Sequence, residues 1–256
     1  MRAKIKTKLT KDYEAMSQYC ADLVEECLKN KPDSLLCFPA GSTAVRTFEI
    51  LCERDRTGQI DFSRAKFVAL DEWLGLSPEA EEEDCTHFMK KNLYGPLAVP
   101  EDRLVLFDVH AEDMEAECRK VDRFIWDNGG IDLMLLGIGM NGHLGLNEPG
   151  SPFDMYTRVV ELSDTTKTVG QKYFSHETTL TGGITVGMRH MFDTRLVVLQ
   201  VSGAHKREIM KALYEGPVTE DLPASVFKLL PGGLIVTDEA AAEYIRTGCD
   251  TVEYID

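Results

Sequence analysis

Residues 131–150 read IDLMLLGIGMNGHLGLNEPG, an apolar run followed by a loop rich in glycine. The apolar run, 131–136, has the length of a buried strand. The first six residues of the loop match G-x-G-x-x-G, a pattern typical of dinucleotide sites. We reject a dinucleotide site because the fingerprint requires a helix to open at its third glycine, whereas two more glycines and a proline follow here within eight residues. The stretch therefore predicts a strand that ends in an extended or turning loop.

Apolar runs of similar length recur along the chain, between stretches with helical spacing. They are residues 35–38, 67–70, 104–107, 196–201 and 234–236. A helix is predicted over about 11–30, with Thr10 as its N-cap and Pro32 just beyond its end. Alternation of this kind indicates a parallel sheet with helices on both faces. We therefore predict an α/β fold: one domain over residues 1–256, doubly wound and Rossmann-like, with a mostly parallel sheet.

Composition limits the classes of partner. The formal net charge of the 256-residue chain is -15, so its surface as a whole repels nucleic acid and acidic membranes. No run reaches the roughly 18 apolar residues of a membrane span. The seven cysteines are widely spread and include no C-x-x-C pair, which indicates a reducing, cytoplasmic compartment and argues against structural zinc. We expect neither nucleic acid nor membrane as a partner.

Polar residues follow the runs that end at Phe38 and Val201. In parallel α/β sheets ligands bind where loops leave the carboxyl ends of the strands. Gly41, Ser42 and Thr43 form a glycine turn with two hydroxyls before a predicted helix, the composition of an anion cradle. Lys206 is placed to meet the same anion. The alternatives are that a hydroxyl merely caps the helix and that Lys206 is solvated.

Two acids, Asp71 and Glu72, come directly after the run that ends at Leu70. At the edge of the sheet, limited solvation raises the pKa of a carboxyl group, so an acid here is a candidate general base. The alternative is that both acids are helix caps or surface charges. Trp73 is interpreted as a packing residue.

The glycine-rich loop holds His143, with Asn141 two residues before it and Glu148 five residues after it. A lone histidine is more often structural than catalytic. Here Glu148 can fold back to orient one ring nitrogen while the other faces a ligand, which predicts a positioned imidazole. The remaining histidines (His87, His110, His176, His190 and His205) lack comparable partners in the sequence and are interpreted as surface or packing residues.

Together these three loops resemble the glucosamine-6-phosphate deaminase/isomerase family, in which Asp-Glu follows one strand and Gly-His with Asn-Glu-Pro follows another. The resemblance covers about residues 35–225, and the pattern over 137–150 is long and specific. Two motifs look most like the galactosamine-6-phosphate deaminase/isomerase branch of this family: Leu-Asp-Glu-Trp at 70–73 and Asn-Gly-His-Leu-Gly-Leu-Asn-Glu-Pro-Gly at 141–150. The implied fold is that of the sugar-phosphate isomerases.

The resemblance implies a role for each matching residue. His143 would open the pyranose ring, and Glu148 would hold its imidazole. Asp71 would move a proton from C2 to C1 of the open aldose, after which ammonia leaves and a ketose 6-phosphate remains. Neither a metal nor an organic cofactor is implied, because the carbonyl of the substrate itself acidifies C2.

The phosphate would be bound by Gly41, Ser42, Thr43 and Lys206. The family places an arginine further along the chain, where this sequence reads Asp-Thr-Thr-Lys at 164–167. We expect Lys167 to replace that arginine as a point charge without its two-pronged geometry.

A second departure is Asn141, which stands where glucosamine-specific members have aspartate. An amide hydrogen-bonds but adds no charge, so an imidazolium at His143 is expected to form less readily than in those members.

Two other functions fit the same fold. A 6-phosphogluconolactonase would attack an ester and normally lacks the Asn-Glu-Pro at 147–149. A sugar-phosphate sensor domain would bind without catalysis and would need a DNA-binding helix-turn-helix, for which the 30 or so residues before the first predicted strand are too few. The resemblance favours an enzyme acting on an amino-sugar phosphate, and it implies a homo-oligomer.

Overall fold

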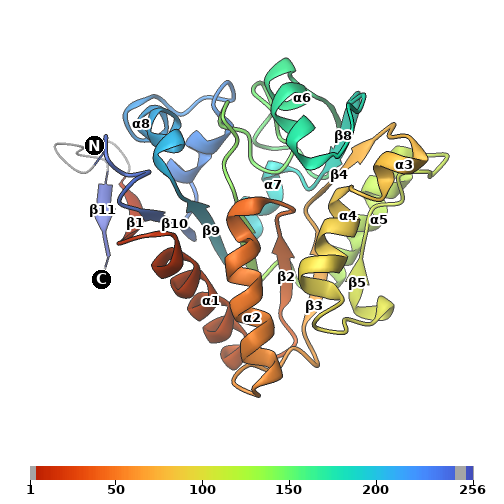
Figure 1. Ribbon diagram of the computed structural model, residues 1–256, viewed down its shortest axis with the longest axis horizontal. Helices are drawn as coiled ribbons and strands as arrows, with labels where there is room; N and C mark the ends of the chain where they lie inside the picture. Colours follow the sequence, from red (N-terminus) through yellow and green to blue (C-terminus); the bar gives the residue numbers. More distant parts are fainter. Residues whose placement is uncertain (1–3, 246–251, 256) are drawn as a thin grey trace.

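A parallel sheet of eight strands forms the centre of the computed structural model, which describes residues 4–245 and 252–255 (Figure 1). Every neighbouring pair in this sheet is parallel. In spatial order the strands are β11 (Val252–Tyr254), β1 (Ile5–Thr10), β10 (Gly233–Asp238), β9 (Leu196–Val201), β6 (Leu133–Leu136), β2 (Leu35–Phe38), β3 (Lys66–Ala69) and β5 (Leu104–Val105).

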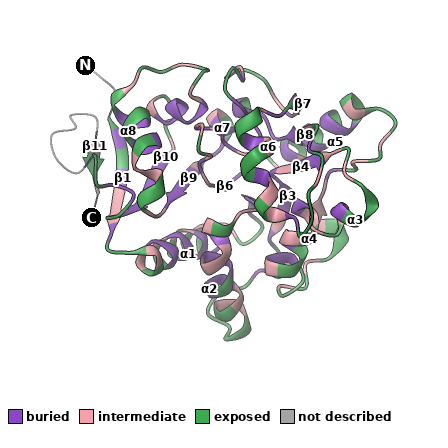
Figure 2. Ribbon diagram, turned by 45° about the horizontal axis from the view of Figure 1, so that its top comes forward, coloured by how far each residue is buried: buried purple, intermediate pink, exposed green. Residues whose placement is uncertain are grey.

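Helices cover both faces of the sheet because its central strands are apolar on both sides. Leu36 and Phe38 of β2 pack with α1 and α2 on one face, whereas Leu35 and Cys37 pack with α5, α7 and α8 on the other. Figure 2 shows the central strands buried, and the edge strand β11 and the outer sides of the helices exposed. The helices are α1 (Tyr13–Asn30), α2 (Val45–Arg56), α3 (Pro78–Glu81), α4 (Cys85–Met89), α5 (Met114–Asp127), α6 (Asp164–Gly170), α7 (Met188–Asp193) and α8 (Arg207–Glu215). The doubly wound α/β fold is confirmed.

Each of the six predicted apolar runs overlaps a strand of the main sheet. The strand β1 was missed, and it pairs with β10 along Thr7↔Ile235 to Thr10↔Asp238. Its sequence, IKTKLT, alternates lysine and threonine with apolar residues and has no apolar run. The expectation of a first strand at residue 35 was therefore wrong.

The predicted N-cap was also wrong. Asp12 caps α1, accepting a hydrogen bond from Ala15 N at 2.9 Å. Thr10 instead ends β1, and its hydroxyl donates to the carbonyl of Thr237 at 3.0 Å.

A second, antiparallel sheet was not expected. It contains β4 (Asp71–Leu74), β8 (Gly182–Thr185) and β7 (Arg158–Glu161), and it lies beside α6 (Figure 1). Asp71 pairs with Thr185 in this sheet, so it opens a strand and does not lie in the predicted loop. Pairing with β8 holds the backbone of Asp71 more rigidly than a loop would.

The sheet changes direction between β2 and β6. From β2 the chain continues outward to β3 and then β5, whereas β6, β9 and β10 follow on the other side of β2. The loops after β2 and β6 therefore diverge, and such a switch point leaves a crevice at the carboxyl ends of the strands.

None of the described helices is long and apolar enough to cross a bilayer. The six cysteines in the described part of the chain are free thiols, and Cys249 lies outside it.

Candidate active site

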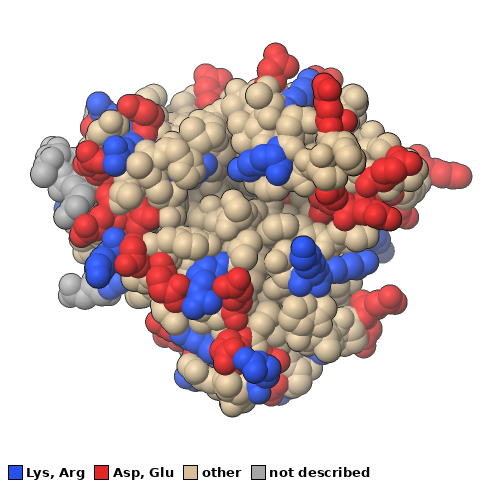
Figure 3. Space-filling view, in the orientation of Figure 1, with Lys and Arg blue, Asp and Glu red and all other residues tan. Residues whose placement is uncertain are grey.

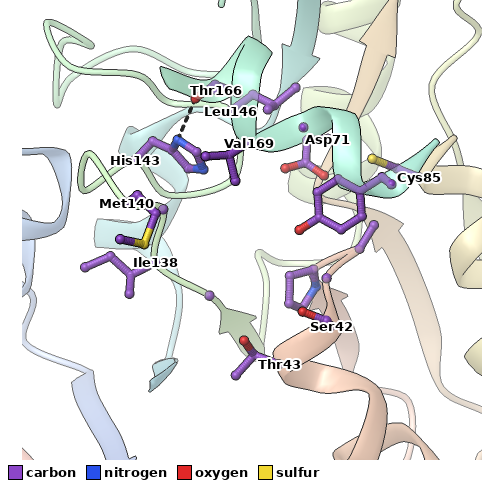
Figure 4. A pocket seen from close by; sticks show the side chains of 18 of the residues that line it. Ser42, Thr43, Asp71, Cys85, Ile138, Met140, His143, Leu146, Thr166 and Val169 are labelled. Carbon is purple, nitrogen blue, oxygen red and sulfur yellow. Dashed lines mark hydrogen bonds between the residues drawn. The ribbon is translucent and has the colours of Figure 1, made fainter. Parts of the chain in front are cut away.

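A pocket of about 310 Å³ opens at the switch point (Figure 4). It is lined by the loops after β2 and β6, the start of β4, α6 and the turn after β9. The volume suits a small ligand such as a phosphosugar. Figure 3 shows Asp and Glu side chains around the edge of one face of the molecule, whose centre is largely covered by uncharged groups.

Asp71 lies in one wall of this pocket and is half-buried. Burial, and secondarily the negative charge of Glu72, raises the pKa of Asp71 to about 7, against a small opposing hydrogen bond from Cys85. Gly145 has a φ of 58°, and a Cβ there would lie 3.3 Å from Asp71 Oδ2 and 2.9 Å from Thr185 Oγ1. A glycine at 145 is therefore required beside this carboxylate.

Glu72 has a different environment. It is 1 % exposed and accepts hydrogen bonds from the backbone N–H groups of Cys85 at 3.0 Å and Thr86 at 2.7 Å, at the start of α4. Of the two adjacent acids, Glu72 is thus a structural cap, and Asp71 alone lines the pocket.

His143 faces the pocket from the loop after β6. Its imidazole lies against Gly139, where an added Cβ would be 2.4 Å from Nε2. Nδ1 is 3.1 Å from Thr166 Oγ1, the hydrogen bond drawn in Figure 4. The glycines of GIGMNGH at 137–143 therefore make space for the imidazole of His143 and do not form a dinucleotide site. No helix begins within this loop.

Glu148 was expected to hold His143 directly. In the structure, the hydroxyl of Thr166 also contacts the imidazole, at the same ring nitrogen. Glu148 Oε2 is 3.6 Å from His143 Nδ1, farther than Thr166 Oγ1. Asn141 Nδ2 donates to Glu148 Oε2 at 2.8 Å, and Ser163 Oγ donates to it at 3.0 Å. Although burial acts in the opposite sense, the nearby polar groups of His143, Thr166 and Asn141, together with the charge of His143, lower the pKa of Glu148 to about 2.

Ser163 and Thr166 were therefore missed as site residues. Both belong to the start of α6, where Ser163 accepts from Thr166 N at 3.2 Å as the N-cap. The stretch Ser-Asp-Thr-Thr at 163–166 is a helix-start signal in the sequence. That signal indicates a cap but does not indicate which loop lies opposite it.

The other end of the pocket is suited to an anion. Ser42 and Thr43 begin a short 3₁₀ turn before α2, and neither side chain caps that helix or makes a hydrogen bond within the described chain. Lys206 Nζ donates to the carbonyl of Ile138 at 2.7 Å. Burial, and then the charge of Lys172, lowers the pKa of Lys206 to about 8.

Comparison with known proteins connects this geometry to a family. Residues 9–233 match the family model described as glucosamine-6-phosphate isomerases/6-phosphogluconolactonase. The chain belongs to this family. It is 37% identical over 235 residues to glucosamine-6-phosphate deaminase of Geobacillus sp. (strain WCH70), covering 91% of this chain and 93% of that protein. It is 38% identical over 221 residues to the deaminase of Lachnoclostridium phytofermentans, covering 86% and 93%.

Solved structures agree with the family assignment. A monomeric glucosamine-6-phosphate deaminase superimposes with a TM-score of 0.88 at 31% identity, covering 94% of this chain and 100% of that one. The 6-phosphogluconolactonase of Trypanosoma cruzi has a TM-score of 0.76 at 18% identity, covering 96% and 98%. At that identity the likeness to the lactonase shows a shared fold alone. The homo-oligomer stays a prediction.

The residue expected to replace the family's arginine lies outside the pocket. Lys167 does not line the pocket, and its Nζ lies 3.8 Å from Asp164 Oδ1 on the exposed side of α6. Lys172 lines the pocket instead, and its charge acts on Lys206 and His205. It was missed because α6 ends at Gly170 and a 3₁₀ turn follows, which changes the direction of the residues beyond.

Among the other histidines, only His205 departs from the interpretation as a surface or packing residue. His205 lines the pocket. Buried His190 has its Nε2 2.7 Å from Asp122 Oδ1, and His87 Nδ1 is 2.9 Å from Asp84 Oδ1. The partner of His190 comes from α5 and that of His87 is the N-cap of α4, and the sequence indicated neither pairing.

Proposed function

We propose that this protein is an amino-sugar-6-phosphate deaminase/isomerase, which converts a 2-amino-2-deoxyaldose 6-phosphate and water to a ketose 6-phosphate and ammonia. One observation carries the proposal. Asp71, with a pKa of about 7, shares a small pocket with the imidazole of His143, and that pocket also holds the hydroxyls of Ser42 and Thr43 and two lysines. The family match and the names of the relatives support this activity.

The phosphate would bind at the end of the pocket that Ser42 and Thr43 line. Gly41 is extended, and Ser42 and Thr43 follow it at the start of the helical segment, where backbone N–H groups have no partner within the helix. Lys206 and Lys172 supply the positive charge that the molecule as a whole lacks. Anchoring the phosphate there leaves the anomeric end of the sugar to reach the opposite wall, which His143 and Asp71 line.

Ring opening would be the task of His143. The imidazole takes the proton of the anomeric hydroxyl and delivers a proton to the ring oxygen, so that the C1 aldehyde forms. Thr166 fixes the ring through Nδ1, and the Glu148 carboxylate lies 3.6 Å from the same nitrogen. Because the pKa of Glu148 is about 2, it stays negative at neutral pH and stabilises the imidazolium that forms in transit. Asn141 and Ser163 hold that carboxylate in place.

Proton transfer between carbons would be the task of Asp71. It removes the proton from C2 of the open aldose, which the neighbouring carbonyl has acidified, and returns it at C1. The product is an imine at C2. Water then adds to that carbon, and ammonia leaves with its bonding electrons to give the ketone. A base with a pKa near 7 suits this step, because it is half-ionised at neutral pH yet strong enough to take a carbon-bound proton.

The finer proposal concerns the sugar. The Asn-Gly-His wording at 141–143 resembles the galactosamine branch and supports galactosamine 6-phosphate, with tagatose 6-phosphate as product. The curated relatives named above are glucosamine-6-phosphate deaminases, which supports glucosamine 6-phosphate.

The test is ammonia release from purified protein, with no added metal, offered the two amino-sugar 6-phosphates in parallel. We expect release from at least one, and the ratio of the two kcat/KM values identifies the C4 epimer. Hydrolysis of 6-phosphogluconolactone without ammonia release from either sugar would contradict the proposal in favour of a lactonase. Tight binding of a phosphosugar without turnover would contradict it in favour of a sensor domain.

The lysine assignment predicts a difference between two neighbouring substitutions. Lys172→Met is expected to raise KM about tenfold or more, since a charge-assisted contact to phosphate contributes roughly 1.5–3 kcal/mol. Lys167→Met is the matched control, because its side chain lies outside the pocket, and KM is expected to stay within about twofold. Steady-state kinetics of both variants with the preferred sugar make the comparison. A larger effect at Lys167 than at Lys172 would refute the assignment.

A further inference from the structure

A second, much smaller hollow lies on the protein side of Asp71. Its volume is about 10 Å³, and its walls include Asp71, Cys85, Met89 and Tyr94. Asp71 and Cys85 also line the large pocket, so they separate the two spaces, and Figure 4 shows both side chains at that wall. A volume near 10–15 Å³ holds about one water molecule, provided that polar groups face it.

Tyr94 supplies one such polar group. Its side chain is 3 % exposed, and its ring packs edge-on against Phe67 with centroids 5.5 Å apart. Its hydroxyl is buried and has no hydrogen-bond partner among the described protein groups. A buried hydroxyl without a partner has lost its hydrogen bonds to water with no replacement, so a native protein rarely leaves one unpaired.

Asp71 supplies the other polar group. Its negative charge acts on Tyr94 and contributes, after burial and Cys37, to raising the pKa of that phenol. Tyr94 ends a short π-helical turn, Lys90–Tyr94, that continues α4. Such turns displace a side chain from the regular helical register and are frequent at functional sites. Tyr94 and Asp71 therefore line one space of the size of a water molecule.

We propose that this hollow holds an ordered water that bridges Tyr94 Oη and the carboxylate of Asp71, which makes Tyr94 a positioning residue for the base. The inference rests on the proposed function, since it refines the role of Asp71. Tyr94 touches no substrate, because it does not line the large pocket.

The bridge has a defined effect on the base. The water accepts a hydrogen bond from the hydroxyl of Tyr94 and donates a hydrogen bond to the carboxylate of Asp71. Both buried groups then have a hydrogen-bond partner. When Asp71 is protonated, the two hydrogen bonds reverse their direction: the acid donates to the water, and the water donates to Tyr94 Oη. Hydrogen bonds to an ionised carboxylate are the stronger ones, so the bridge favours the charged form. It opposes part of the rise in pKa that burial causes, and it fixes the orientation of the carboxylate toward the pocket.

The variant Tyr94→Phe removes the hydroxyl and keeps the ring. We expect the pKa of Asp71 to rise by roughly 0.5–1 unit, because one modest hydrogen bond to the charged form is lost. The acid limb of the pH profile of kcat/KM should move to higher pH by the same amount. At pH values below the limb, kcat/KM should therefore fall about 3–10-fold, while its plateau value changes little. The pKa is measured in ligand-free protein by ¹³C NMR of aspartate carboxyl carbons, with Asp71→Asn to assign the signal.

Tyr214→Phe is the matched control. Tyr214 is also fully buried, and its hydroxyl lies 2.6 Å from Thr7 Oγ1, away from the pocket. This variant should lower the midpoint of thermal unfolding without moving the pKa of Asp71 or the acid limb. A general loss of stability therefore does not imitate the effect expected at Tyr94.

A crystal structure of the wild-type protein at high resolution completes the test. Electron density for a water within hydrogen-bond distance of Tyr94 Oη and Asp71 is expected, and its absence would overturn the proposal. An unchanged pKa of Asp71 in Tyr94→Phe would overturn it as well. The NMR and crystallographic measurements need no substrate, so they stay decisive even if the wild-type protein releases no ammonia, the result that would refute the proposed function instead.

Discussion

Asp71→Asn is expected to lower kcat by about 10²–10⁴-fold, the range for loss of a positioned general base. The amide has almost the same shape, so the pocket and its hydrogen bonds to the substrate persist while proton abstraction from C2 stops. Two measurements separate these effects. Exchange of the C2 proton with D₂O should disappear, whereas binding of a non-reactive sugar 6-phosphate should weaken by no more than a few fold.

Asp164→Asn is the matched control for this substitution. Asp164 lies at the start of α6, close to the pocket, but its side chain is fully exposed. Its kcat should equal that of the wild-type protein. Persistent C2 exchange in Asp71→Asn, or an equal loss in Asp164→Asn, would exclude Asp71 as the base.

The same assignment predicts a bell-shaped dependence of kcat/KM on pH. Asp71 works as a carboxylate, so kcat/KM should rise with pH through about 7, the pKa of this group. Lys206 binds phosphate as an ammonium, so kcat/KM should fall again above about 8, the pKa to which burial and Lys172 lower it. In Lys206→Arg the basic limb should move to higher pH, because the guanidinium stays charged there. A basic limb unchanged in that variant would remove Lys206 from the phosphate site.

His143→Asn is expected to lower kcat/KM by about 10²–10³-fold, since the proton shuttle between the anomeric hydroxyl and the ring oxygen is lost. The loss should be concentrated in ring opening. In the reverse direction, with the ketose 6-phosphate and ammonia, formation of the imine should persist while closure of the pyranose ring slows. Rapid-quench analysis of the open-chain and cyclic products measures the two steps separately.

His205→Gln provides the comparison for His143. His205 also lines the pocket but has no carboxylate comparable to Glu148, and the neighbouring lysines help to lower its pKa after burial. Its substitution should change KM for the phosphosugar more than kcat. Equal losses of kcat in the two variants would show that general disturbance of the pocket, rather than the His143 shuttle, limits the reaction.

The sequence predicted the part of the fold that depends on short apolar runs. A strand buried on both faces needs consecutive apolar residues, so 131–136 and 196–201 were visible without a structure. The same reasoning missed β1, because its lysines and threonines interrupt any run of apolar residues. It also missed β4, β7 and β8. Strands of a small antiparallel sheet are specified by partners distant in the chain, as in the pairing of Asp71 with Thr185.

For the site, the sequence by itself determined the main residue types and their neighbourhood: Asp71, His143 and Glu148 follow strands, and parallel strands bring their carboxyl ends to one edge. Only the tertiary structure decided which polar groups face one another. It placed the hydroxyl of Thr166 against the imidazole of His143, Lys172 rather than Lys167 in the pocket, and Tyr94 beside the small hollow next to Asp71. The physical reason is that local spacing sets the face of one element, whereas a hydrogen bond across the pocket depends on how separate elements pack.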